Sequence, residues 1–145
     1  MSVVICAVDF SDAGKGVVTT AAKEAQLRGA KLWLVHVAAP DPSFVGYDAG
    51  PDNERQFRAE HLRKEHEDLR IRAEELNADG IDATAMLIQG PTAEMLVKEA
   101  DDLQAELIVI GSHGHGIWHR LIAGSTEESV IQQANCPVMV IPVGD

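Results

Sequence analysis

The sequence predicts an α/β fold in which a doubly wound, five-stranded parallel sheet carries helices on both faces. Five short apolar stretches alternate along the chain with four stretches of helical character, in the order βαβαβαβαβ. Four of the apolar stretches are nearly continuous, which is typical of strands that are buried on both faces of a parallel sheet. Because the 145 residues contain no evident linker or repeat, we expect a single domain over residues 1–145.

The expected strands are runs of aliphatic and β-branched residues. Residues 2–10, 32–38, 106–111 and 137–143 are almost uniformly apolar. Residues 82–89 alternate more between apolar and polar side chains, so we expect this strand to be less buried than the others.

The first two expected helices each end at a glycine. The first covers residues 12–28, is capped by Ser11 and stops at Gly29, and the second covers residues 53–78 and stops at Gly80. The first helix presents small side chains to the sheet, at Ala13, Val17, Ala21 and Ala25. The second has an apolar stripe made of Leu62, Leu69, Ala73 and Leu76.

The second helix also carries a histidine, His66, on the side of its stripe, and we expect this residue to be partly buried rather than a ligand. The third helix begins around Pro91, and the last begins near Thr126 and is stopped by Pro137. Residues 39–53 are rich in Pro, Gly and Asp, so they are expected to form a loop.

The composition argues against several classes of partner. A net charge of −11 disfavours nucleic acids and anionic membranes, and an aromatic content of 4% disfavours a stacking platform for bases. Cys6 and Cys136 are expected to be free thiols. The chain contains no apolar run of membrane-spanning length and its start lacks the features of a signal peptide, so we expect a cytoplasmic protein.

Two of the expected strands end in polar residues. Asp9 lies at the end of the first strand, and residues 111–114 follow the fourth. Ligands of doubly wound sheets bind outside the carboxyl ends of the strands, where the strand order reverses. If these two strands are neighbours, both ends frame one crevice.

The stretch GSHGHGIWHRLIAGS, residues 111–125, contains four glycines and three histidines. Its glycines would let backbone N–H groups approach a phosphate, and the helix that begins near Thr126 would add its positive end. A glycine-rich loop followed by the ordinary helix cap Ser125 explains the pattern equally well, and both interpretations remain open.

Two other interpretations of this stretch are weaker. His113, His115 and His119 could bind a metal ion, but no acidic or cysteine partner stands at a telling spacing. Ser112 does not lie in the GxSxG pattern of a nucleophile elbow, and no Ser/His/Asp set is specified by spacing.

Several separated motifs, in the same order, resemble those of the universal stress protein family. ATP-binding members carry the pattern G-x2-G-x9-G-[ST], and Gly111, Gly114, Gly124 and Ser125 fit this spacing. The resemblance also includes AVDFS in the first strand, GP before the third helix, AELIVIGSHG and the ending NCPVMVIP. It covers the chain except for residues 40–60.

The resemblance implies the strand order 3-2-1-4-5 and an adenine nucleotide between strands one and four. The adenosine part would contact Ala7, Val8, Asp9 and Val37. The ribose and phosphates would be wrapped by Gly111, His113 and Gly114, and the phosphates would be held by Gly124, Ser125 and Thr126.

The resemblance further implies a stress-response sensor or regulator that binds ATP, ADP or AMP, with or without Mg²⁺, and forms a homodimer through residues 137–143. No positioned general base is evident, so we expect ATP hydrolysis to be slow at most. The alternative function is a nucleotide-free dimeric interaction module of the same fold.

Overall fold

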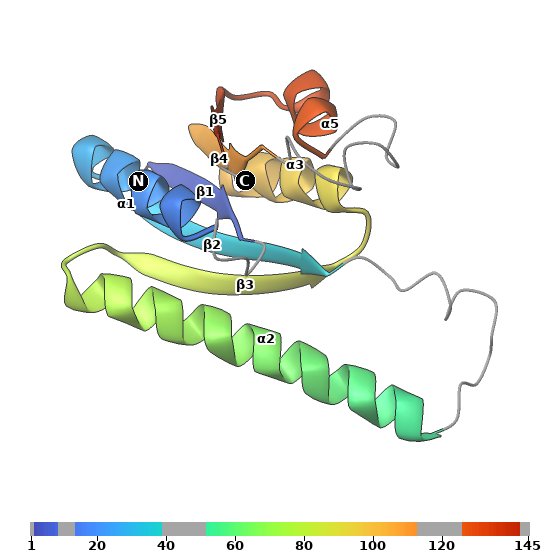
Figure 1. Ribbon diagram of the computed structural model, residues 1–145. Helices are drawn as coiled ribbons and strands as arrows, with labels where there is room; N and C mark the ends of the chain where they lie inside the picture. Colours follow the sequence, from blue (N-terminus) through green and yellow to red (C-terminus); the bar gives the residue numbers. More distant parts are fainter. Residues whose placement is uncertain (1, 9–13, 39–51, 113–125, 143–145) are drawn as a thin grey trace.

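The computed structural model describes residues 2–8, 14–38, 52–112 and 126–142. In these residues, five parallel strands form one sheet with the order β3-β2-β1-β4-β5 (Figure 1). This arrangement confirms the predicted doubly wound fold class and the strand order implied by the resemblance. Helices connect consecutive strands, as parallel pairing requires.

The strands differ in burial according to their place in the sheet. Their bounds are β1 Val3–Ala7, β2 Lys31–Ala38, β3 Ala83–Gln89, β4 Leu107–Gly111 and β5 Val138–Ile141. The central strands β1 and β4 are buried almost throughout, whereas the edge strands β3 and β5 are mostly half-buried. The lower burial predicted for residues 82–89 is confirmed against β1 and β4. The strand expected at 137–143 was predicted to be buried, but β5 is half-buried because it lies at an edge of the sheet, and it is shorter than expected and stops before Pro142.

In the part of the chain that the structure describes, two helices cover each face of the sheet. Their bounds are α1 Gly14–Arg28, α2 Asp52–Ala78, α3 Thr92–Leu103 and α5 Thr126–Gln133. One apolar core lies under α1 and α2 and contains Val17, Ala21, Ala25, Leu69 and Ala73, all of which the sequence assigned to helix faces. A second core lies under α3 and α5 and contains Leu96, Ala100 and Val130. The predicted Ser11 cap and Ala13 lie outside the described residues.

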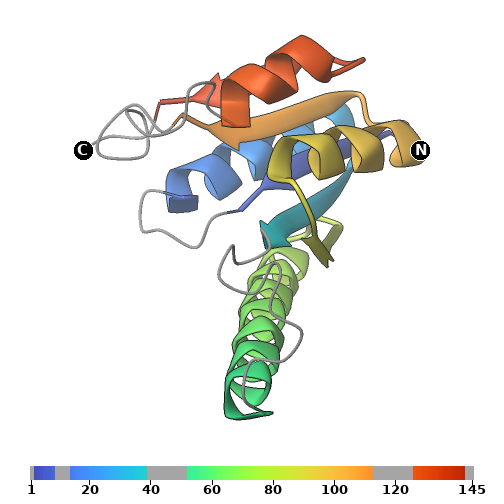
Figure 2. The same cartoon turned by 90° about the vertical axis from the view of Figure 1, so that its right-hand side faces the viewer.

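Helix α2 is much longer than the strand it covers. Its 27 residues extend about 40 Å, whereas the seven residues of β3 extend about 23 Å. Both views show its N-terminal part projecting past the carboxyl ends of the strands (Figures 1 and 2). Leu69 and Ala73 are buried and Leu76 is half-buried, so the C-terminal half of α2 is the part that is anchored on the sheet.

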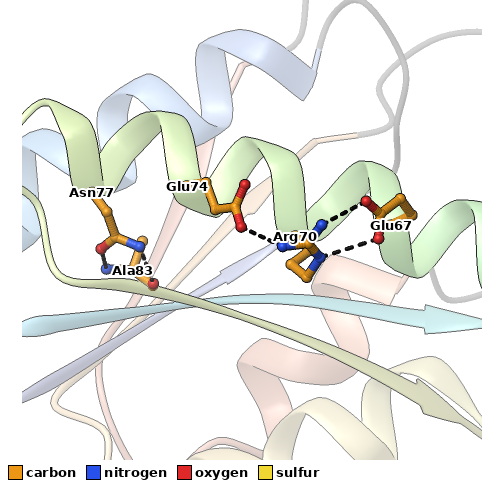
Figure 3. Close-up of polar contacts among 5 residues, drawn as sticks. All are labelled: Glu67, Arg70, Glu74, Asn77 and Ala83. Carbon is orange, nitrogen blue, oxygen red and sulfur yellow. Dashed lines mark hydrogen bonds and ion pairs between the residues drawn. The ribbon is translucent and has the colours of Figure 1, made fainter.

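A side-chain amide joins the end of α2 to the edge strand β3 (Figure 3). The Oδ1 atom of Asn77 accepts a hydrogen bond of 2.9 Å from the N–H of Ala83, and its Nδ2 donates one of 3.1 Å to the carbonyl of Ala83. Leu32, opposite Ala83, bonds instead to Asp82, so these two groups of Ala83 point away from β2. Asn77 therefore satisfies polar groups on the open edge of the sheet.

On the solvent face of α2, Arg70 bridges two carboxylates one turn away on either side (Figure 3). It donates to both oxygens of Glu67, at 3.1 and 2.6 Å, and also contacts Glu74. The hydrogen bond from Arg70 lowers the pKa of Glu67. These three side chains lie on a solvated surface of the helix, where ion pairs contribute little stability.

Gly90 makes the turn from β3 into α3 in a conformation that other residues avoid. Its φ is +142°, and a Cβ atom built there would lie 2.8 Å from Cγ of Met95. Gly29 also has a positive φ, of +61°, but a Cβ there would meet nothing within 4 Å. A side chain at position 90 would therefore meet both an unfavourable φ and a steric conflict, whereas a side chain at position 29 would meet an unfavourable φ alone.

Replacing Gly90 by Ala is expected to lower the free energy of unfolding by about 2–3 kcal/mol, because the new side chain adds a contact with Met95 to an unfavourable φ. Gly29→Ala is the matched control and should cost only about 1 kcal/mol. Urea denaturation of both variants measures the difference. Equal losses would mean that Met95 moves aside freely.

Candidate functional site

The order of the strands reverses between β1 and β4, at the centre of the sheet. The chain adds β2 and β3 on one side of β1 and places β4 and β5 on the other. Cys6 pairs with Val109, so continuing this register places Val8 opposite Gly111. Because ligands of open α/β sheets bind at such a point, outside the carboxyl ends of the strands, this edge is the candidate site.

Five of the predicted site residues lie in the described part of the chain, and all five lie at or near the carboxyl edge of the sheet. Ala7 and Gly111 are the last residues of β1 and β4, and Val37 is the last but one of β2. Val8 follows β1, and its N–H donates to the carbonyl of Val35 at 2.8 Å. The other predicted residues, Asp9, His113, Gly114, Gly124 and Ser125, lie outside the described residues.

The fifth residue, Thr126, is the first of α5. This helix returns the chain from the carboxyl end of β4 to the start of β5, so its N-terminus faces the same edge as Gly111. The N-terminus of a helix attracts anions, because its first N–H groups lack partners within the helix. The fold thus brings a positive helix end to the side of the switch point.

The side chains at the end of β1 diverge. Ala7 packs with Val37 on the face covered by α3 and α5, whereas Val8 belongs to the core under α1. Of these two residues, only Ala7 can share a wall with Val37 through its side chain. Val8 is 5% exposed and reaches the edge of the sheet mainly through its backbone.

Beside this edge lies a polar cluster that the sequence analysis missed, made of His36 on β2 and His61 and Glu65 on α2. His36 Nδ1 lies 2.6 Å from the carbonyl oxygen of Val8, and His36 Nε2 lies 2.7 Å from Oε2 of Glu65. Oε1 of Glu65 lies 2.6 Å from Nε2 of His61. The one sign of this cluster in the sequence was His36 itself, a polar residue inside the apolar run 32–38.

The prediction for His66 is wrong, since its side chain is exposed. The neighbouring Glu65 is the residue that turns toward the sheet, with a side chain 17% exposed. A carboxylate can occupy this position because His36 offers it a partner.

Other chemistry suggested by the residue types is not assembled in the described part of the chain. No group of three or more His, Cys, Asp and Glu there could hold a metal ion, and His113, His115 and His119 lie outside it. Cys6 and Cys136 are thiols that form no disulfide, and burial raises the pKa of the Cys136 thiol, with a smaller contribution from Asp101. None of the described helices is long and apolar enough to cross a bilayer.

Together, the sheet and its switch point define an open α/β protein with a candidate ligand crevice between β1 and β4. The sequence pattern of the Universal stress protein family matches residues 1–142, and the chain belongs to this family. No protein with a curated description matches it.

Several solved structures are similar. A universal stress protein from Archaeoglobus fulgidus in complex with dAMP is 27% identical, with a TM-score of 0.64 over 97% of this chain and 98% of that one. UspA from Lactobacillus plantarum is 25% identical, with a TM-score of 0.74 over 97% of both chains. A universal stress protein from Archaeoglobus fulgidus DSM 4304 is 26% identical, with a TM-score of 0.71 over 99% of this chain, which spans only 45% of that protein.

Proposed function

We propose that this chain binds an adenine nucleotide at the carboxyl edge of its sheet, between β1 and β4. The observation that carries the proposal is the juxtaposition of Val8, Gly111 and the N-terminus of α5 at the switch point. The dAMP complex of the relative from Archaeoglobus fulgidus supports an adenine nucleotide as the ligand class. The spacing of Gly111, Gly114 and Gly124 supports a phosphate-binding loop.

In this proposal, the two parts of the nucleotide contact different segments. The adenosine contacts the ends of β1 and β2, at Ala7, Val8, Asp9 and Val37. The ribose and phosphates contact the stretch after β4 and the start of α5, at Gly111, His113, Gly114, Gly124, Ser125 and Thr126. ATP, ADP or AMP, with or without Mg²⁺, would serve a cytoplasmic sensor or regulator in the stress response, and hydrolysis would be slow at most.

The first experiment is to denature the purified protein and separate the released small molecules by ion exchange. A near-stoichiometric adenine nucleotide is the expected result, and calorimetric titration of emptied protein with ATP and AMP should then give saturable binding. A protein that releases no nucleotide and binds neither in the calorimeter would overturn the proposal in favour of the nucleotide-free interaction module.

We also propose that the chain forms a homodimer through β5. Within the described residues this strand pairs with β4 alone, and all four of its apolar residues are half-buried. An uncovered apolar edge favours pairing with another strand.

Light scattering at micromolar concentration is expected to give twice the chain mass of 15.6 kDa. The carbonyls of Pro137 and Ile141 accept hydrogen bonds from the N–H groups of Ile108 and Ser112, so by alternation the main-chain groups of Val140 point away from β4. Val140→Pro removes one outward N–H and should shift the protein toward the monomer. A wild-type monomer, or a variant that remains fully dimeric, would contradict pairing through this edge.

A further inference from the structure

His36 is a polar side chain in a face of β2 that is otherwise apolar. It alternates with Leu32 and Leu34, which are fully buried under α1 and α2, and its own side chain is only 17% exposed. α1 presents Val17 and Ala21 to this face, and Leu87 of β3 lies beside His36 in register. A histidine in such surroundings needs polar partners for its ring.

Each ring nitrogen of His36 has an oxygen beside it. The carbonyl of Val8 can only accept a hydrogen bond, so Nδ1, at 2.6 Å, must be the donor. Nε2 lies 2.7 Å from Oε2 of Glu65. This oxygen atom is buried, and the contact with His36 is an ion-pair contact. The second oxygen of Glu65 contacts Nε2 of His61, so His61 helps to hold the carboxylate that contacts the ring of His36.

The carbonyl that His36 binds lies where β1 separates from β2. Their ladder ends at the pair Ala7 and Val35. One residue further, the N–H of Val8 still bonds to Val35 at 2.8 Å, while its carbonyl is bonded by the His36 side chain. The backbone of Val8 is thus held through both polar groups. It lies two residues beyond Cys6, the last residue of β1 that pairs with β4, at the carboxyl edge where β4 ends in Gly111.

We propose that His36 is a positioning residue for the nucleotide crevice. By holding the carbonyl of Val8, it fixes the direction in which the main chain leaves β1, and Glu65 and His61 of α2 fix the ring that does so. This inference rests on the proposed function, because it assigns to His36 an effect on nucleotide affinity rather than on folding alone. It makes α2 part of the support of the crevice without contact with the ligand.

Two substitutions separate the contacts of His36. In Asn the amide nitrogen is attached to Cγ, as Nδ1 is in histidine. His36→Asn can therefore still donate a hydrogen bond to the carbonyl of Val8, but it loses the contact with Glu65. In Gln the amide nitrogen lies one bond further, as Nε2 does, so His36→Gln can reach Glu65 but leaves the carbonyl of Val8 without its donor. Each variant removes one of these two contacts, so their stabilities are expected to be similar.

The test is calorimetric titration of the wild type and both variants with ATP and with AMP, together with thermal unfolding of each protein without nucleotide. We expect His36→Asn to bind within about threefold of the wild type and His36→Gln to bind about tenfold more weakly. The loss should be the same for ATP and AMP, because Val8 is assigned to the adenosine part.

The outcomes distinguish this inference from the function on which it rests. If the wild type binds nucleotide and both variants bind it equally well, the inference is overturned. It is also overturned if each variant loses affinity only in proportion to the fall in its melting temperature, because His36 then has a structural role alone. If the wild type binds neither nucleotide, the proposed function fails and the inference fails with it.

Discussion

Replacing Gly124 by Asp is expected to abolish the binding of ATP and of AMP, with a loss of affinity on the order of a hundredfold or more, or at least about 2.7 kcal/mol. Gly124 stands two residues before Thr126, where α5 begins. A carboxylate in this position would occupy the positive end of the helix and repel a phosphate. It would also add bulk where a backbone is proposed to approach the ligand closely.

The charge and the bulk can be separated with two controls. Gly124→Ala adds a methyl group without charge and should bind more tightly than Gly124→Asp. Gln132→Glu adds one negative charge at an exposed position near the far end of α5 and should bind like the wild type. Calorimetric titration of the three variants measures the differences, and retention of ATP by Gly124→Asp would remove the phosphate-binding role from this glycine.

The arrangement of the core was predictable because burial leaves a direct signal in the sequence. β4 is bonded on both sides and covered on both faces, and its residues Leu107 to Ile110 form an unbroken apolar run. Within the described residues β3 pairs with β2 alone, and its alternation predicted its lower burial, whereas the continuous apolar run of β5 did not predict that this strand is half-buried. The glycines at 29 and 80 ended the helices as expected because both adopt a positive φ.

The side of α2 that faces the sheet was harder to predict, because two residues flank its stripe symmetrically. Glu65 lies three residues after Leu62 and four before Leu69, whereas His66 lies four after and three before. Helical periodicity alone does not choose between them. The sheet decides between them, because His36 on β2 contacts Glu65 and not His66. This contact depends on how α2 packs on the sheet, which the sequence of the helix does not specify.

The candidate site was predictable as a location but not as a set of contacts. Strand ends and the family resemblance placed Val8 and Gly111 at one edge, and the parallel pairing of β1 with β4 brings the carboxyl ends of these two strands side by side. The support of Val8 by His36 could not be predicted, because it joins three elements whose packing no local pattern specifies.

The largest expected loss of stability comes from Leu69, the fully buried anchor of α2. Leu69→Ala should lower the free energy of unfolding by about 2–5 kcal/mol, because it leaves a cavity between α2 and the sheet. Ile71→Ala is the matched control on the same helix. Ile71 is 42% exposed and Ala is the better helix former, so this change should stay within about 0.5 kcal/mol. Urea denaturation of both variants measures the difference.

The same pair of variants tests whether α2 supports the crevice. Leu69 lies one turn after Glu65, so loosening this part of α2 should also loosen the contact between Glu65 and His36. At a temperature where Leu69→Ala is still folded, we expect its affinity for AMP to fall several-fold, while Ile71→Ala keeps that of the wild type. If Leu69→Ala loses stability but binds AMP as tightly as the wild type, α2 contributes to the fold alone, and the carbonyl of Val8 is held without its help.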